Sequence, residues 1–225
     1  GLSRRDTLDI DTPWGRPSAP LLAGEFAGIP VLFLSRHGRP HAIAPHAINY
    51  RANISALHAA GARRVLALAA VGGIGPAMHA ARVVIPDQLI DYTWGRAHSF
   101  LDGEHMPLDH VDFTDPYDAG LRAALVAGAR ANAVDAVDGG CYGVTQGPRL
   151  ETAAEVRRLA QDGCDIVGMT GMPEAALARE LGLAYACCAI VANRAAGLAS
   201  GRITMDMVRD NLARPACDAV GCVAA

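Results

Sequence analysis

Three polar groups follow one another between residues 143 and 193, each at a predicted boundary of secondary structure. Glu151 comes after a Gly-Pro-Arg-Leu turn, and Met169 and Thr170 stand where a strand meets a helix. Asn193 ends a long apolar strand. Polar side chains that come from separate elements of an α/β scaffold usually converge on a ligand. This set of groups suits a purine nucleoside held beside an anion.

A second candidate segment, residues 35–41 (SRHGRPH), directly follows an apolar run. Arg36 offers a planar fork of donors and His37 another donor, which suits phosphate. A solvated basic turn explains the segment equally well. A metal site is a third alternative because three histidines fall within residues 37–46. No cysteine or carboxylate joins them, and two prolines interrupt any helix that would align them, so we expect no metal.

Each of these residues also has a purely structural interpretation. Glu151 would be favourable at a helix start, Thr170 could cap a helix, and Met169 could belong to the core. An amide such as that of Asn193, at the end of a ten-residue apolar strand, needs partners if buried. The glycines at 72, 73 and 75 follow a strand without GxGxxG spacing. They indicate a turn that lets backbone approach a ligand rather than a dinucleotide loop.

Apolar runs and helical periodicity alternate along the chain, which predicts an α/β fold with a largely parallel sheet. The run at 29–35 is continuous, as in a strand buried on both faces. A long surface loop is expected over 94–115, and Pro116 is expected in the first turn of a helix. The predicted strands cover 29–35, 65–71, 83–90, 141–144, 164–168 and 183–192. The predicted helices cover 49–60, 151–161 and 204–213, one starting at 115, and one from 170 to 182.

Bulk composition restricts the class of protein. The chain has 225 residues, 51% hydrophobic and 19% charged, with a net charge of −3. These values predict one domain over residues 1–225 and exclude a polyanion track, so no nucleic-acid partner is expected. Six cysteines without CxxC spacing favour a reduced, cytoplasmic setting. The longest apolar run is too short to span a membrane, and no membrane partner is expected.

In combination, the motifs resemble the trimeric purine nucleoside phosphorylase family, most closely its methylthioadenosine phosphorylase branch. The matching segments are residues 12–18 (TPWGRPS), 36–38 (RHG), 49–53 (NYRAN), 147–149 (GPR), 165–170 (DIVGMT) and 172–174 (MPE). The resemblance spans almost the whole chain. It implies one α/β domain with a mixed, barrel-like sheet, assembled as a homotrimer with sites at subunit interfaces.

In that family inorganic phosphate attacks the ribosyl C1′ and displaces the purine, with phosphate as a co-substrate and no cofactor. The resemblance implies that Asn193, Glu151 and His37 are catalytic. It implies phosphate binding by Arg36, His37, Thr170 and the backbone at Ala70. The implied nucleoside contacts are Met169 at the ribose, Leu150, Glu151, Asn193 and Ala195 around the base, Met205 and Val208 at the 5′ end, and His110 and Phe113 toward the neighbouring subunit's site.

The base contacts depart from the adenine-specific branch, which has Asp at the position of Asn193 and a small hydroxyl residue at that of Glu151. Hypoxanthine presents O6 as an acceptor and N1–H as a donor. Asn193 can donate to O6 and accept from N7–H, and Glu151 can accept from N1–H. Adenine would place a lone pair against the carboxylate. Sites built on such hydrogen bonds reject mismatched analogues by as much as roughly 10⁴–10⁵, so a 6-oxopurine is expected.

The residues expected around the 5′ position of the nucleoside indicate a second feature of the substrate. Inosine and guanosine phosphorylases place a His near the 5′-hydroxyl, whereas residues 203–208 (ITMDMV) contain none. An unpartnered buried hydroxyl costs about 1–3 kcal/mol, and a buried methylene-sized group gains about 0.8 kcal/mol. The expected reaction is phosphorolysis of S-methyl-5′-thioinosine to hypoxanthine and 5-methylthioribose 1-phosphate. Alternatives are a methylthioadenosine phosphorylase, a broader 6-oxopurine nucleoside phosphorylase, hydrolysis by water, or a non-catalytic nucleoside-binding protein.

One further departure concerns the N-terminus. The family opens with a strand and a Gly-Gly-Ser/Thr-Gly loop that grips phosphate, whereas this sequence starts at Gly1-Leu2, at the end of that loop. We therefore expect that the first strand and the phosphate loop are missing from the sequence. A chain that truly lacked them would bind phosphate less tightly.

Overall fold

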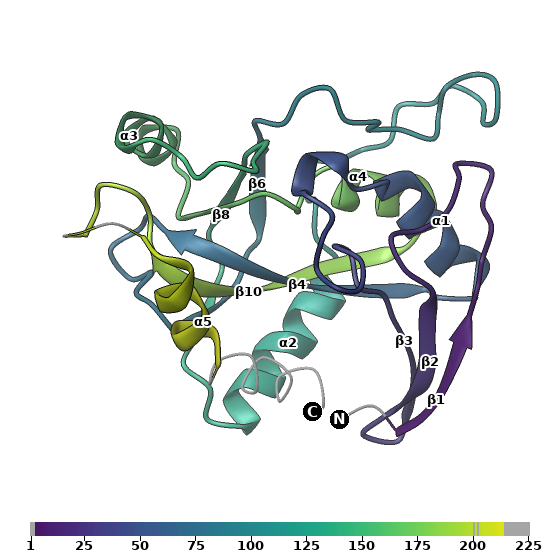
Figure 1. The fold of residues 1–225 in the computed structure, drawn as a ribbon, viewed down its shortest axis with the longest axis horizontal. Helices are drawn as coiled ribbons and strands as arrows, with labels where there is room; N and C mark the ends of the chain where they lie inside the picture. Colours follow the sequence, from purple (N-terminus) through teal and green to yellow (C-terminus); the bar gives the residue numbers. More distant parts are fainter. Residues whose placement is uncertain (1–2, 200, 202, 214–225) are drawn as a thin grey trace.

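A computed structural model describes residues 3–199, 201 and 203–213 (Figure 1). These described residues form two β-sheets, of three and seven strands. The smaller has the order β1-β2-β3, with β1 (Ser3–Leu8), β2 (Leu21–Phe26) and β3 (Ile29–Phe33). The larger has the order β6-β8-β9-β4-β10-β5-β7, with β4 (Arg64–Gly73), β5 (Val83–Ile85), β6 (Gln88–Asp91), β7 (Ala136–Asp138), β8 (Cys141–Val144), β9 (Ile166–Gly168) and β10 (Ala184–Arg194).

The helices cover both sides of the larger sheet. They are α1 (Tyr50–Ala59), α2 (Ala119–Ala131), α3 (Ala153–Gln161), α4 (Glu174–Glu180) and α5 (Met205–Ala213), with a short 3₁₀ turn at Pro45–Ala47. Alternate residues of β10 explain this layering, because successive side chains of a strand point to opposite faces. Tyr185 and Cys187 pack in one core cluster with α1 and α4, whereas Ala186 and Cys188 pack in another with α2. Figure 1 shows α2 on the opposite side of β10 from α1 and α4.

The pair formed by β4 and β10 is the centre of the fold. The two strands run parallel, with Ala184 opposite Arg64 and Asn193 opposite Gly72. Residues 185–192 are all buried, as a strand covered on both faces requires. The apolar runs at 65–71 and 183–192 therefore predicted their strands correctly. The strands extend further than predicted, because Gly72 and Gly73 continue β4 rather than forming a turn.

The larger sheet is mixed, curled and largely parallel, as predicted. The pairs β4–β10, β5–β7, β6–β8 and β8–β9 are parallel, whereas β5–β10 and β4–β9 are antiparallel. On the side of β4 away from β10, the described strands pair only at Gly72 and Gly73. Residues 64–71 therefore pair with no described strand on that edge. Leu68, which is 38% exposed, lies in this stretch.

The prediction for residues 29–35 was wrong about burial. The strand β3 belongs to an antiparallel hairpin with β2, and Ile29 and Phe33 are 57% and 46% exposed. Ala27 and Gly28 form the turn with φ values of 50° and 79°. Positive φ at both central residues is typical of the tight turns that fit the twist of hairpin strands. A run of apolar residues alone did not distinguish this exposed hairpin from a buried parallel strand.

Several boundaries also differ from the predictions. Pro116 precedes α2, which starts at Ala119 behind the cap residue Asp118. The residue before α4 is Pro173 and no side chain caps that helix, so the prediction of Thr170 as a cap was wrong. The predicted strand at 83–90 is divided into β5 and β6, and β1, β2 and β7 were not predicted. Residues 94–115 contain no helix or strand, as expected.

Candidate functional site

The sheet register brings the ends of four strands into one row. Val144 of β8 lies opposite Gly168 of β9, and Val167 lies opposite Gly72 of β4. Gly72 is in turn opposite Asn193 of β10. The segments that carry the predicted contacts therefore leave the sheet in one region. Strand order, which periodicity does not reveal, creates this proximity.

The predicted base-binding loop is tied to the predicted ribose contact. The hydroxyl of Thr145 donates to Oε1 of Glu151 at 2.6 Å, and the Thr145 amide donates to the Gly168 carbonyl at 2.8 Å. Gly147 has φ of +62°, and a Cβ at this position would collide with Sδ of Met169. Only glycine fits this position without displacing its neighbour. Glu151 and Met169 thus belong to one packed unit.

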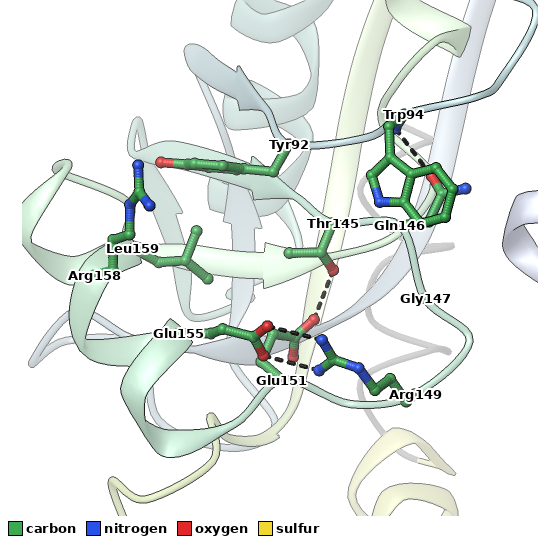
Figure 2. Close-up of a pocket in the computed structure, with 10 residues that line it drawn as sticks. All are labelled: Tyr92, Trp94, Thr145, Gln146, Gly147, Arg149, Glu151, Glu155, Arg158 and Leu159. Carbon is green, nitrogen blue, oxygen red and sulfur yellow. Dashed lines mark hydrogen bonds and ion pairs between the residues drawn. The ribbon is translucent and has the colours of Figure 1, made fainter.

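A cleft of about 320 Å³ lies beside this unit (Figure 2). Glu151 lines it, whereas the other predicted substrate and phosphate contacts do not. Trp94, at its rim, is 70% exposed. Arg149 forms two 2.8 Å bonds to the carboxylate of Glu155 at another side. The lining residues are Tyr92, Trp94, Thr145, Gln146, Gly147, Arg149, Glu151, Glu155, Arg158 and Leu159.

Asn193 lies half-buried at the end of β10, and its Nδ2 donates to the Arg194 carbonyl at 2.7 Å. Ala195 is buried, and its amide donates to the Gly73 carbonyl at 2.9 Å. Leu150, predicted on the base face, is 49% exposed. The bond to the Arg194 carbonyl uses one of the two Nδ2 hydrogens of Asn193, so the second hydrogen remains for a ligand.

A hydrogen bond connects helix α5 to β10 at Ala192, the residue before Asn193. Nδ2 of Asn211 donates to the Ala192 carbonyl at 2.8 Å. This bond brings the predicted 5′ contacts to the same end of the sheet. Val208 is half-buried on α5, while the Met205 side chain lies outside the part of the chain that the structure describes.

Arg36 is held between α4 and β4. Its Nε and Nη2 donate to the carboxylate of Glu174 at 2.6 and 2.8 Å, and its Nη1 donates to the Leu68 carbonyl at 3.0 Å. A guanidinium has five N–H groups, and these bonds use three, so two remain for a ligand. Ala70, two residues along the same strand, is exposed.

The carboxylate that fixes Arg36 is itself buried. Glu174 is 5% exposed and also accepts a 2.9 Å hydrogen bond from the hydroxyl of Tyr185. Burial lowers the pKa of Arg36, but the facing carboxylate outweighs this and leaves the pKa raised. Burial also raises the pKa of Tyr185 well above its ordinary value. Arg36 is thus a permanent, preorganised cation.

His37 follows Arg36 and is fixed by backbone. Its Nδ1 lies 2.8 Å from the Ile43 carbonyl, and its ring stacks on His41 at 4.2 Å between centroids. A carbonyl only accepts, so Nδ1 carries the proton and Nε2 is the nitrogen left for a ligand. Burial is the largest cause of the lowered pKa of His37. The neutral imidazole is therefore favoured.

The remaining predicted contacts lie in different surroundings. Thr170 is 8% exposed, between Met169 and the start of α4. His110 is exposed on the long loop. Phe113 is half-buried, and the guanidinium of Arg179 lies 5.9 Å from its ring centroid. Phe113 thus packs against a residue of its own chain.

Sequence reasoning missed three side chains that hold this region together: Thr145, Glu174 and Arg96. Glu174 lay inside the MPE segment, where a carboxylate beside apolar helix positions indicated a buried partner. Arg96 lay in a segment with no periodic pattern, which gave no such indication. The described residues contain no group of three metal-ligating side chains. No helix among them is long and apolar enough to cross a membrane.

Comparison with known proteins identifies relatives of this chain. The chain is 54% identical over 212 residues to a probable S-methyl-5′-thioinosine phosphorylase of Xanthomonas campestris pv. campestris, covering 94% of this chain and 85% of the relative. It is 44% identical to a 6-oxopurine nucleoside phosphorylase of Pyrococcus furiosus, covering 94% of this chain and 81% of the relative. A crystal structure of a methylthioadenosine phosphorylase from an Antarctic soil metagenomic library superposes with a TM-score of 0.92 at 34% identity, covering 99% of this chain and 78% of that one. The family model of the phosphorylase superfamily matches residues 2–225, and the chain belongs to that family.

Proposed function

We propose that this chain catalyses the phosphorolysis of S-methyl-5′-thioinosine, with hypoxanthine and 5-methylthioribose 1-phosphate as products. An oxygen of inorganic phosphate forms the new bond to C1′. The C1′–N9 bond breaks, and its electron pair leaves with the purine. The proton that HPO₄²⁻ loses on forming the sugar ester ends on the purine, which leaves as neutral hypoxanthine. The proposal includes a cytoplasmic homotrimer that needs neither metal nor cofactor, with phosphate as the co-substrate.

The hydrogen bond between Thr145 and Glu151 is the observation that carries the proposal. It fixes Oε1 of the carboxylate, and among the described residues Oε2 accepts no hydrogen bond. An oriented carboxylate oxygen is a suitable acceptor for the N1–H of a 6-oxopurine. The names of the relatives from X. campestris and P. furiosus support a 6-oxo base.

The proposed phosphate site combines Arg36, His37, Thr170 and the backbone at Ala70. The two N–H groups that Arg36 keeps are held in fixed directions by its ion pair with Glu174. Such a preorganised cation stabilises an anion without reorganising during the reaction. His37 lies next to it along the chain, and its unprotonated Nε2 can accept a hydrogen bond from a P–OH group of phosphate.

In the proposed mechanism, phosphate supports an oxocarbenium-like ribosyl centre while the purine gathers negative charge. Asn193 would stabilise this charge by donating to O6 and accepting from N7–H. The interaction strengthens as charge develops and therefore favours the transition state. Met169 would lie along the ribose, and Leu150 and Ala195 would contact the base.

The proposed preference for a 5′-methylthio group rests on α5. Val208 is half-buried on α5, and neither valine nor methionine, the residue type at the predicted contact Met205, has a side-chain hydrogen-bond donor. Such side chains favour S-methyl over a hydroxyl that would lose its water. His110 and Phe113 are proposed to reach the neighbouring subunit's site in the trimer.

A substrate panel tests the proposal. Methylthioinosine, methylthioadenosine and inosine are each incubated with and without phosphate, and the free base and the sugar product are measured. We expect fast, phosphate-dependent hypoxanthine release from methylthioinosine, with 5-methylthioribose 1-phosphate as the co-product. Faster release from inosine would favour a general 6-oxopurine nucleoside phosphorylase, which the P. furiosus relative supports as the second candidate.

The remaining outcomes would overturn the proposal. Phosphate-independent release would indicate hydrolysis, and preference for methylthioadenosine would indicate adenine specificity. Binding without release from any of the three nucleosides would indicate a nucleoside-binding protein. The oligomeric state is measured separately by light scattering, where a mass other than three chains would contradict the homotrimer.

A further inference from the structure

Arg96 is a buried cation, 7% exposed, in the loop between β6 and α2. Its Nη1 donates to the carbonyls of Met169 and Met172 at 2.9 and 2.5 Å, and to the Tyr50 hydroxyl at 3.2 Å. Met169 and Met172 stand on either side of Thr170 and Gly171. One end of the guanidinium thus fixes the turn that carries the proposed phosphate contact Thr170.

The other nitrogens of Arg96 reach the loop after β8. Nη2 donates to the carbonyls of Thr145 and Gln146 at 3.2 and 2.8 Å, and Nε donates to Oε1 of Gln146 at 3.1 Å. This loop carries the hydroxyl that orients Glu151. A single side chain therefore bridges the proposed base-binding loop and the proposed phosphate-side turn.

The acceptors of Arg96 are all uncharged. Six acceptor atoms surround its five N–H groups. No carboxylate among the described residues forms an ion pair with it. Burial is the main cause of the lowered pKa of Arg96, while Tyr50 and Asp91 act in the opposite direction. A buried arginine without a carboxylate partner is costly and unusual, which argues for a role beyond filling space.

We propose that Arg96 is a positioning residue that fixes the separation between the base-binding loop and the phosphate-side turn. The inference rests on the proposed function, because that function assigns opposite ends of one substrate complex to the two segments. Arg96 has no N–H left for substrate, so it acts through Thr145 and through the carbonyls beside Thr170. Arg96 thereby couples the base-binding loop to the phosphate-side turn, so that bound phosphate strengthens the binding of the purine base.

The geometry of the guanidinium explains why arginine is required. Its planar fork directs donors to both segments at once, whereas a lysine ammonium is a single point with three donors. Lysine retains the positive charge but cannot serve both loops from one position. A misplacement of about 1 Å in a catalytic arrangement costs roughly 10²-fold in rate, so loss of the bridge predicts an effect of that order.

The test compares Arg96→Lys and Arg96→Met with Arg157→Lys and Arg157→Met. Arg157 is exposed on α3 and serves as the matched control. We expect kcat/KM with methylthioinosine to fall about 10²-fold in both Arg96 variants, with higher KM for phosphate and for nucleoside. The Arg157 variants should match the wild type. Hypoxanthine is also titrated with and without phosphate, and the enhancement by phosphate should disappear in the Arg96 variants.

A purely structural role would give a different result. In that case the Arg96 variants would melt at lower temperature but keep wild-type KM, kcat and phosphate enhancement when assayed well below melting. That outcome, or Arg96→Lys with wild-type constants, would overturn the inference. If these variants do not fold, Gln146→Leu removes the acceptor of Arg96 Nε, which also accepts from the Trp94 amide, and should reduce the enhancement partly. Absence of phosphate-dependent release by the wild type would instead reject the proposed function.

Discussion

At the scale of single residues, the proposed phosphate site depends on a cation that is already paired. Arg36 donates three of its five N–H groups to Glu174 and to the Leu68 carbonyl, and two N–H groups remain. Glu174 therefore does more than neutralise charge, since it sets the direction of the donors that remain. The same carboxylate accepts the Tyr185 hydroxyl, so the whole arrangement is anchored in the core.

Glu174→Gln tests this arrangement. The amide retains the shape of the carboxylate but leaves the half-buried Arg36 without its counter-charge. We expect the free energy of unfolding to fall by about 3–5 kcal/mol, measured by urea denaturation. Phosphate should then stabilise the variant more than it stabilises the wild type, because it supplies the missing charge.

The control for this variant is Glu104→Gln, since Glu104 is an exposed residue of the long loop. Its stability should lie within about 0.5 kcal/mol of the wild type. A Glu174→Gln protein as stable as this control would show that the ion pair contributes nothing measurable.

At the scale of elements, α3 is the helix whose start fixes the position of Glu151. Thr152 accepts the Glu155 amide at 3.1 Å, and Glu155 accepts the Thr152 amide at 2.7 Å. This reciprocal capping box satisfies two amides that have no helical partner. The helix therefore begins at Ala153, two residues after Glu151, which is proposed to meet the base.

Thr152→Ala should weaken that start. Loss of the cap hydroxyl costs about 1 kcal/mol, which for a chain of this size lowers the melting temperature by roughly 2–4 °C. Calorimetry measures the shift. Thr152→Ser keeps the hydroxyl and should remain close to the wild type, and equal melting of the Ala and Ser variants would argue against the cap.

The elements also show what the sequence could predict. Strands β4 and β10 and helix α1 followed from long apolar runs and helical periodicity, because burial on both faces or on one face imposes those patterns. The exposure of β3 did not follow, since partners such as β2 lie outside any local window. Strand order, and with it the row that joins Gly168, Gly72 and Asn193, depends on the whole topology.

The candidate site was predictable to a similar degree. The strand-end positions of Thr170 and Asn193 followed from the apolar runs before them. The bridge made by Arg96 did not, because its partners are mainly backbone carbonyls far away in sequence. Every residue has a backbone carbonyl, so the amino-acid sequence does not identify which carbonyls accept from Arg96.

At the scale of the whole molecule, stability should depend on pH through His37. Burial lowers its pKa from the ordinary value of 6.5, so the unfolded chain binds more protons than the folded chain just below that pH. The free energy of unfolding therefore rises with pH in this window. The stabilisation is complete above 6.5 and is lost as pH falls toward the lowered pKa of the folded state.

His37→Gln should flatten this dependence. Urea denaturation at and below pH 6.5 gives the free energy of unfolding for both proteins, and their difference isolates the contribution of His37. His58, exposed at the end of α1, provides the control His58→Gln, which should keep the wild-type slope. Equal slopes for His37→Gln and wild type would contradict the assignment.

The three strands β1, β2 and β3 hydrogen-bond to one another and not to the strands of the larger sheet. The chain passes from β3 almost directly into Arg36 and His37. Local opening of this three-stranded sheet would therefore weaken phosphate binding by Arg36 and His37, while the larger sheet stays folded. Bound phosphate would in turn make local opening of these three strands rarer. The backbone amides of β3 would then exchange their hydrogens with solvent more slowly when phosphate is abundant.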